Sequence, residues 1–186
     1  ATVAGETGTA PRIAVGYDGR LSSPELADAL VDGLTQSGAD VIRIGRGPTP
    51  MLYFATHKLD VDGGMMITGS HNPAEYNGIK MVLQGKAFYG DDIQALGKRI
   101  AAGNFAEGQG AVSDQDIADA YVDRLLAGFS LGLPLRVAWD PGNGASGDIV
   151  QKLVRRLPHT HVLINEVIDG TFPAHHPDPT VEKNLE

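Results

Sequence analysis

The chain contains no cysteine among its 186 residues. Disulfide bonds, thiolate nucleophiles and cysteine-ligated zinc sites are therefore excluded. Long apolar segments are also missing, because no run approaches the roughly 18 residues that a membrane-spanning helix needs. We therefore expect a cytoplasmic protein without a membrane partner.

Positive charge is also sparse. The chain has 15 Lys and Arg against 23 Asp and Glu, which gives a net charge of −8. The basic residues are scattered, whereas nucleic-acid binders gather them on one face, so we expect no nucleic-acid partner. Hydrophobic residues make up 42% of the chain, enough for a buried core, and 24 glycines and 11 prolines predict many tight loops.

Short β-branched runs alternate with helical patterns through the first half of the chain. Strands are predicted at 12–16, 40–44, 63–67 and 79–83, and helices at 23–38 and 51–58. This alternation predicts βαβ units, hence an α/β fold with a mixed, mostly parallel sheet flanked by helices. Two more helices are predicted at 91–102 and 114–127, separated by a polar, glycine-rich loop.

The β/α rhythm then restarts in a shorter form. A strand at 135–139 precedes a glycine-rich loop, a helix at 149–157 and a strand at 161–164. One helix and two strands cannot bury both faces of a sheet. We therefore expect one full domain over residues 1–129 and a partial second α/β domain over 130–186, in a chain that is a piece of a longer protein.

The segment after the third predicted strand carries reactive side chains. Ser70 and His71 follow the strand directly, and Lys80 lies on the next one. A serine-hydrolase elbow, G-x-S-x-G, would need a final glycine, but Asn72 stands there. A serine that carries a phosphoryl group fits better, because ligands bind at the carboxyl ends of parallel strands. An ordinary turn that Ser70 caps is the structural alternative.

This loop, TGSHNPAEYNGIKM at 68–81, resembles the active-serine loop of the α-D-phosphohexomutases, the phosphoglucomutase/phosphomannomutase family. The shared signature is Thr-(Ala/Gly)-Ser-His-Asn-Pro followed by Asn-Gly-(hydrophobic)-Lys. Three other segments resemble the same family in the same order: VGYDGRLSSPEL at 15–26, PTPMLYFA at 48–55 and DGTFPAHHPDPTVEKNL at 169–185. The resemblance therefore runs over most of the chain.

The resemblance implies a mechanism for each matching residue. A phosphoserine at Ser70 would exchange its phosphoryl group with glucose or mannose phosphates, between C1 and C6, through a bisphosphorylated sugar. Ser70 would also give an oxygen to Mg²⁺, Lys80 would be the general acid/base, and His71 would assist. Arg20 and Asn72 are candidates for contacts with phosphate or substrate, although Arg20 equally suits a carboxylate partner.

Several of the family's parts do not appear in this sequence. We find no Tyr-Asp-Ile-Arg-Gly segment before Arg12 and no Asp-Gly-Asp-Gly-Asp metal loop. The sugar-specificity loop and the phosphate-binding loop of the family's third and fourth domains are also absent. We therefore expect the piece to carry the phosphoryl donor, to lack the remaining Mg²⁺ ligands, and to be inactive alone.

A dinucleotide-binding domain is the alternative function. Gly142, Gly144 and Gly147 fit G-x-G-x-x-G between a predicted strand and a helix, and Glu166 follows the next strand. That arrangement suits NAD or FAD. Pro141, directly before the first glycine, favours a tight turn with packing glycines instead.

Two further possibilities concern the end of the chain and its general role. His175, His176 and Asp178 could hold a metal, but the surrounding prolines favour a rigid loop. A non-catalytic binding module that happens to retain the serine loop is a third class of function. The presence of both Ser70 and Lys80 argues against such a pseudoenzyme.

Overall fold

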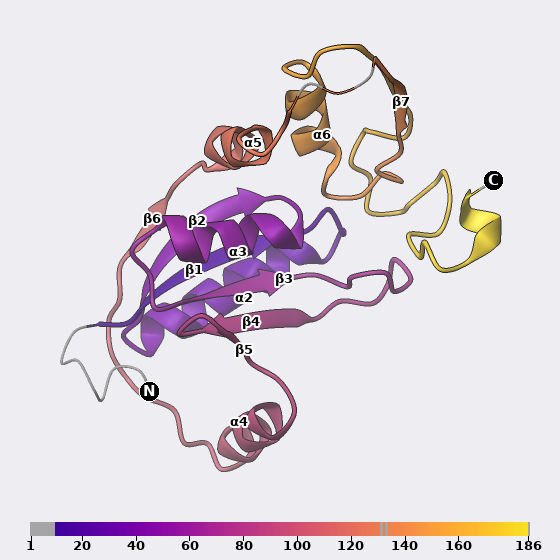
Figure 1. Cartoon of the computed structure of the whole chain (residues 1–186). Helices are drawn as coiled ribbons and strands as arrows, with labels where there is room; N and C mark the ends of the chain where they lie inside the picture. Colours follow the sequence, from indigo (N-terminus) through magenta and orange to yellow (C-terminus); the bar gives the residue numbers. More distant parts are fainter. Residues whose placement is uncertain (1–9, 131, 133, 186) are drawn as a thin grey trace.

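The computed structural model describes residues 10–130, 132 and 134–185, which form a six-stranded sheet and a smaller two-stranded one (Figure 1). The large sheet has the order β5-β4-β3-β1-β2-β6. Its parallel strands are β1 (Arg12–Tyr17), β2 (Asp40–Arg46), β3 (Gly63–Ile67) and β6 (Val112–Asp114). The strands β4 (Ile79–Leu83) and β5 (Lys86–Ala87) are antiparallel to their neighbours. The expected mixed, mostly parallel sheet is confirmed.

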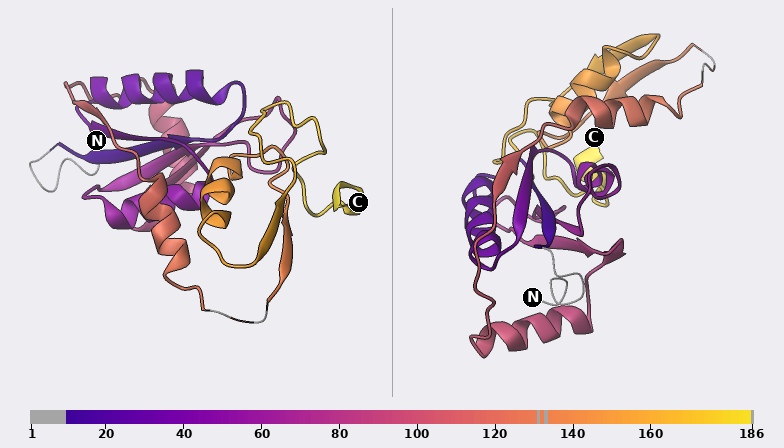
Figure 2. Two further views of the ribbon diagram at one scale, coloured as in Figure 1. Left: turned by 90° about the horizontal axis from the view of Figure 1, so that it is seen from above. Right: turned by 90° about the vertical axis from the view of Figure 1, so that its left-hand side faces the viewer.

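Helices α2 (Ser23–Gln36) and α3 (Thr49–Lys58) cover opposite faces of this sheet (Figure 2). The alternation of side chains along β1 divides the core between the two faces. Ile13 and Val15 pack in the cluster that includes Val31 of α2, whereas Ala14 packs in the cluster that includes Leu52 of α3. Both helices have a proline at the first or second helical position, where no backbone hydrogen bond is lost.

Two short strands and several helix boundaries differ from the sequence prediction. β5 and β6 are not predicted, because both are brief and exposed and exist only through pairing with β4 and β2. The helix expected at 114–127 is shorter, α5 (Ala118–Leu126), since β6 takes its first residue. Helix α4 (Asp91–Ala101) has no buried side chain. It stands apart from the sheet, below β4 and β5 in the view of Figure 1.

The second unit contains β7 (Arg136–Trp139), α6 (Gly147–Val154), β8 (Thr160–Leu163) and the 3-10 helix η1 (Glu182–Leu185). β7 and β8 pair in parallel as a two-stranded sheet. Ile149 of α6 joins the core cluster of the first unit on the α3 side. No helix in the described part of the chain is both long and apolar enough to cross a membrane.

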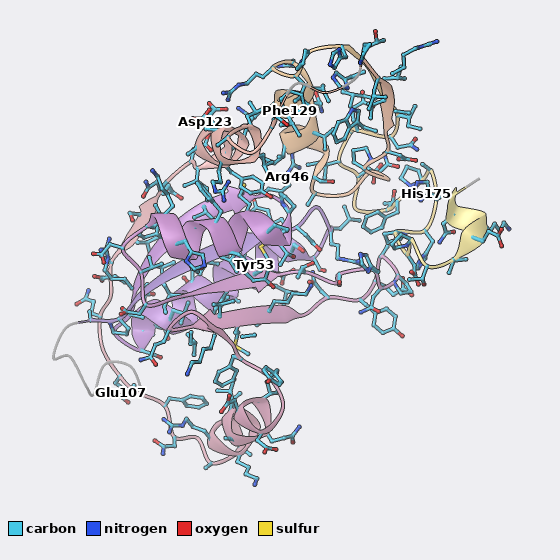
Figure 3. The ribbon with its side chains drawn as sticks, viewed as in Figure 1. Arg46, Tyr53, Glu107, Asp123, Phe129 and His175 are labelled. Atoms are coloured by element: carbon cyan, nitrogen blue, oxygen red, sulfur yellow. The ribbon has the colours of Figure 1, made fainter. Side chains whose placement is uncertain are left out.

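Ion pairs also fasten the α6 region to α5 and to the large sheet. Lys152 of α6 and Arg156, two residues beyond its end, lie 2.7 Å from Asp119 and Asp123 of α5. Arg46, at the end of β2, projects toward α6 (Figure 3), and its guanidinium is 2.9 Å from the Asp148 carboxylate. These pairs are exposed, so each adds little stability, but together they orient α6 on the first unit.

Candidate active site

The two loops that form the site leave the sheet side by side. β1 and β3 are parallel neighbours, so the turn after Tyr17 and the loop after Ile67 emerge at the same edge. The ladder extends into both loops, because the Asp18 N–H donates to the Ile67 carbonyl at 2.9 Å. This pairing brings Arg20 against the Ser70 loop.

Arg20 holds the backbone of the Ser70 loop from beneath. Its side chain is fully buried, and its Nε donates to Asp18 Oδ2 at 3.2 Å. The two terminal nitrogens donate to four loop carbonyls, those of Ser70, Asn72, Pro73 and Tyr76. All five guanidinium N–H groups therefore have partners within the protein. Of the two roles considered for Arg20, the structure shows the carboxylate pair, and the N–H groups that a phosphate contact would need are engaged within the protein.

Asp18 connects Arg20 to both elements around it. Its Oδ1 accepts hydrogen bonds from the Ser23 hydroxyl at 2.6 Å and the Arg20 N–H at 3.0 Å. Its Oδ2 accepts from the Gly69 N–H at 3.2 Å as well as from the Arg20 side chain. The carboxylate thus ties the start of α2, the turn after β1 and the serine loop into one buried unit.

Gly69 is required by the close approach of Arg20. A Cβ atom at this position would lie 2.3 Å from Arg20 Nε and 2.5 Å from the Tyr76 carbonyl oxygen, well inside contact distance. Its φ lies outside the left-handed region, so the requirement is steric rather than conformational.

Ser70 stands exposed at the top of this framework. Its φ of 54° lies in the left-handed region, which is uncommon for a residue with a side chain. The Ser70 N–H donates to Thr68 Oγ1 at 3.0 Å. Arg20 holds its carbonyl at 3.0 Å. The unusual conformation is thus fixed from both sides of the residue and directs the hydroxyl into solvent.

Lys80 reaches Ser70 because β4 turns back along β3. The antiparallel register places Lys80 opposite Met66, and its Nζ lies 3.4 Å from Ser70 Oγ. The return loop is fastened by Asn77, whose Nδ2 donates to the hydroxyls of Ser22 and Ser23 at 3.0 and 2.8 Å. A serine hydroxyl and a lysine ammonium therefore share one exposed position.

The remaining predicted residues of the loop lie beside this pair. His71 and Asn72 are exposed, and the backbone of Asn72 is hydrogen-bonded to Gly69 and Arg20. Asp178 of the second unit lies near enough to be influenced by His71. Hydrogen bonds from Thr180 lower the Asp178 pKa most, and the charge of His71 lowers it further.

The glycine-rich loop after β7 is filled by the protein itself. A Cβ at Gly142 would lie 2.7 Å from the His175 ring, and one at Gly147 only 2.0 Å from the Glu166 carbonyl oxygen. Asn143 is buried, and its Nδ2 donates to the Val167 carbonyl at 2.9 Å. These glycines therefore serve close packing, as the tight-turn reading requires, and a dinucleotide site is not favoured.

The histidines near the end of the chain have partners other than a metal. His175 Nε2 lies 3.1 Å from Asp140 Oδ2, and Figure 3 shows His175 on the loop below β7. A hydrogen bond with the His176 carbonyl, reinforced by Asp140, raises the pKa of His175. His176 Nδ1 accepts from the Asp178 N–H at 3.3 Å. Among the described residues, no three His, Asp or Glu side chains gather as a metal site.

Asp18, Gly69 and Asn77 are the site residues that the sequence analysis missed. Each shapes the loop instead of facing solvent. Asp18 and Asn77 carried a weak signal, since both sit in turn-forming dipeptides with glycine.

Comparison with protein families assigns nearly the whole chain. Residues 1–107 match the sequence profile of phosphoglucomutase/phosphomannomutase, alpha/beta/alpha domain I. Residues 119–186 match the profile of alpha/beta/alpha domain II of the same enzymes.

Similar proteins agree with this assignment. The chain is 42% identical to a phosphomannomutase/phosphoglucomutase of Pseudomonas aeruginosa over 94% of its own length and 38% of that protein. It is 44% identical to a phosphoglucomutase of Neisseria gonorrhoeae, over 100% of this chain and 41% of that one. A crystal structure of a phosphoglucomutase/phosphomannomutase family protein from Burkholderia thailandensis superposes with a TM-score of 0.92 at 44% identity, covering all of this chain and 42% of its own. The chain thus spans about two fifths of the length of these relatives, and it belongs to the phosphoglucomutase/phosphomannomutase family.

Proposed function

We propose that this chain is the phosphoryl-carrying part of a phosphohexomutase. The whole protein would move a phosphoryl group between C1 and C6 of a glucose or mannose phosphate, through a phosphoserine at Ser70 and a bisphosphorylated sugar. The observation that carries the proposal is the Lys80 Nζ atom, 3.4 Å from Ser70 Oγ at the exposed carboxyl edge of the sheet. The names of the relatives support the substrate class, and a cytoplasmic location stays a prediction.

The geometry suggests how Lys80 would act. When the phosphoryl group leaves Ser70 for a sugar hydroxyl, negative charge develops on Oγ, and a lysine ammonium at hydrogen-bond distance can donate a proton to it. His71 would take the proton that the sugar hydroxyl loses. In the return step the neutral amine would accept the proton of the Ser70 hydroxyl as the new O–P bond forms, and His71 would return a proton to the sugar oxygen. Asn72 would contact the phosphate or the sugar.

Arg20 would act through the shape of the loop. Its five N–H groups are engaged by Asp18 and by four loop carbonyls, so the donors that a phosphate would need are already used. The guanidinium instead keeps Ser70 in its left-handed conformation. Such fixed placement is worth much in phosphoryl transfer, where most of the catalysis is positioning and charge stabilisation.

The described residues supply little of a magnesium site by themselves, since no cluster of carboxylates or imidazoles forms among them. We propose that Ser70, through its oxygen or its phosphate, is the ligand that this chain contributes. Mg²⁺ prefers oxygen ligands and, when bound, would neutralise charge on the phosphate. The other ligands would come from the rest of the protein.

The test is intact-mass analysis of the full-length protein combined with a mutase assay. We expect a phosphate on Ser70 that Ser70→Ala removes together with the activity. Ser37→Ala is the matched control, because Ser37 is also exposed but caps the end of α2. An active full-length enzyme without phosphate on Ser70 would overturn the mechanism, and mutase activity of the 186-residue chain alone would contradict the expectation that the fragment is inactive.

A further inference from the structure

A turn of the second unit lies directly on Arg20. The Phe172 ring covers the guanidinium, with Arg20 Cζ 5.1 Å from the ring centroid, a distance typical of a cation–π contact. The same guanidinium holds the Ser70 loop. Arg20 therefore links Phe172 to Ser70 through direct contacts, although Phe172 and Ser70 lie about a hundred positions apart in the sequence.

The backbone on either side of this contact is packed without spare room. A Cβ at Gly170 would lie 2.6 Å from the Gly19 carbonyl oxygen and 2.7 Å from the Leu21 nitrogen. A Cβ at Gly19 would lie 2.4 Å from Ile168 Cγ2. The turn after β1 and the turn before Phe172 thus fit together through two glycines, which seats the ring in one place.

The turn also forces Phe172 into an uncommon conformation. Its φ is 51°, in the left-handed region that bulky residues avoid. Asp169 stabilises the turn, because its Oδ1 accepts from the Thr171 N–H at 2.9 Å and the Thr171 hydroxyl at 2.7 Å. The Phe172 N–H donates to the Asp169 carbonyl at 3.0 Å. A bulky residue persists in such a conformation when its surroundings determine it, and this strain is common at functional sites.

We propose that Phe172 is a positioning residue for phosphoryl transfer at Ser70. Its ring shields the Arg20 guanidinium from water, so that water does not compete for the N–H groups that hold the loop carbonyls. Docking of the second domain is thereby coupled to the shape of the serine loop. The structural half of this inference, that Phe172 stabilises the shape of the serine loop, follows from the contacts above. The catalytic half, that this shape speeds phosphoryl transfer, rests on the proposed function.

The structural half is tested by hydrogen exchange on the 186-residue chain. Phe172→Leu keeps the apolar bulk but removes the ring, and we expect the amides of Asn72 and Tyr76 to exchange roughly fivefold faster, the scale of one lost cation–π contact. Phe172→Tyr should match the wild type. Phe105→Leu, at an exposed phenylalanine after α4, is the matched control. Unchanged exchange in Phe172→Leu would overturn the proposal.

Asp169→Ala gives an independent route to the same readout. This change releases the turn that seats the ring and leaves both Arg20 and Phe172 in the chain, so loop exchange should again rise severalfold. If Phe172→Leu unfolds the chain, this variant decides the outcome. Wild-type exchange in Asp169→Ala would contradict a role for the seated ring.

The catalytic half is tested in the full-length protein by single-turnover transfer of phosphate from Ser70. Phe172→Leu should slow the transfer severalfold at saturating hexose phosphate with the KM nearly unchanged, and Phe172→Tyr should restore it. A change in KM alone, or a loss of thermal stability with a normal transfer rate, would overturn it. If Ser70 carries no phosphate even in the wild type, the proposed function fails. The hydrogen-exchange experiment still tests the effect of Phe172 on the serine loop.

Discussion

Gly69→Ala is the sharpest test of the buried framework under Ser70. The added methyl carbon would lie 2.3 Å from Arg20 Nε and 2.4 Å from Arg20 Cζ, so either the loop or the guanidinium must move. If the loop shifts, the cost is that of overpacking a core, about 1–3 kcal/mol. If Arg20 is displaced, a buried ion pair loses its partner, which costs about 3–5 kcal/mol.

The two cost ranges share a value of about 3 kcal/mol, which we take as the expected loss in the free energy of unfolding. For a chain of this size, each kcal/mol changes the melting temperature by about 2–4 °C. Thermal unfolding followed by circular dichroism should therefore show a Tm lower by roughly 6–12 °C. In the full-length enzyme, activity should fall as well, because Ser70 loses its fixed conformation.

Gly33→Ala is the matched control. Gly33 lies on the exposed side of α2, and a Cβ there would meet no atom within 4 Å. Alanine in a helix is more favourable than glycine by about 0.5–1 kcal/mol, so this variant should melt slightly higher. A Gly69→Ala variant that melts and reacts like the wild type would show that Arg20 does not occupy the position described.

Two other changes address the lysine and the histidine pair. Lys80→Ala in the full-length enzyme should lower turnover by about 100-fold or more, because a general acid/base is lost. The exposed position of Lys80 should keep the free energy of unfolding within about 0.5 kcal/mol of the wild type. His175→Gln should destabilise the chain at pH 5.5 but much less at pH 8.5, as measured by urea unfolding at each pH.

The pH dependence follows from both partners of the histidine pair. A raised His175 pKa adds stability below the ordinary histidine value of about 6.5, and this stability is lost as the pH rises through the folded pKa. Burial opposes ionisation of Asp140, yet hydrogen bonds from Gly142, Asn165 and His175 lower its pKa, so its contribution is lost only in acid. The interaction between His175 and Asp140 therefore stabilises the fold most between about pH 4 and pH 6.5.

Lys80→Ala has a matched control, and both Lys80→Ala and His175→Gln have an outcome that would contradict the expectation. Lys86→Ala removes an exposed lysine from the neighbouring strand β5 and should leave turnover unchanged. Turnover of Lys80→Ala within a few-fold of the wild type would exclude it as the acid/base. A His175→Gln effect of equal size at both pH values would show that the charge of the imidazole does not contribute.

The central strands could be predicted from the sequence because each is a short apolar run between turn residues, and β3 and β4 have the expected bounds. β5 and β6 could not, since a two- or three-residue exposed segment becomes a strand only when a partner edge lies beside it. The domain boundary at residues 129 and 130 stays a prediction.

Some residues of the candidate site could likewise be predicted from the sequence, whereas others could not. Ser70 and Lys80 could be proposed because the loop and the start of the next strand resemble the active-serine signature of the family. The role of Arg20 could not, since its loop partners lie 50 to 56 positions away and its charge would equally suit a phosphate. Gly69 and Phe172 matter only through contact with that buried guanidinium, and no local pattern reveals such a contact.

The Arg20 contacts also have a consequence for the order in which the chain folds. The β3–β4 hairpin is local and can bring Lys80 near Ser70 within microseconds of collapse. The left-handed conformation of Ser70 depends on contacts between the first and third strands, and such non-local pairing forms more slowly. A chain still leaving the ribosome therefore presents Ser70 as an ordinary flexible serine, and the residue acquires its final presentation only when the sheet has closed around Arg20.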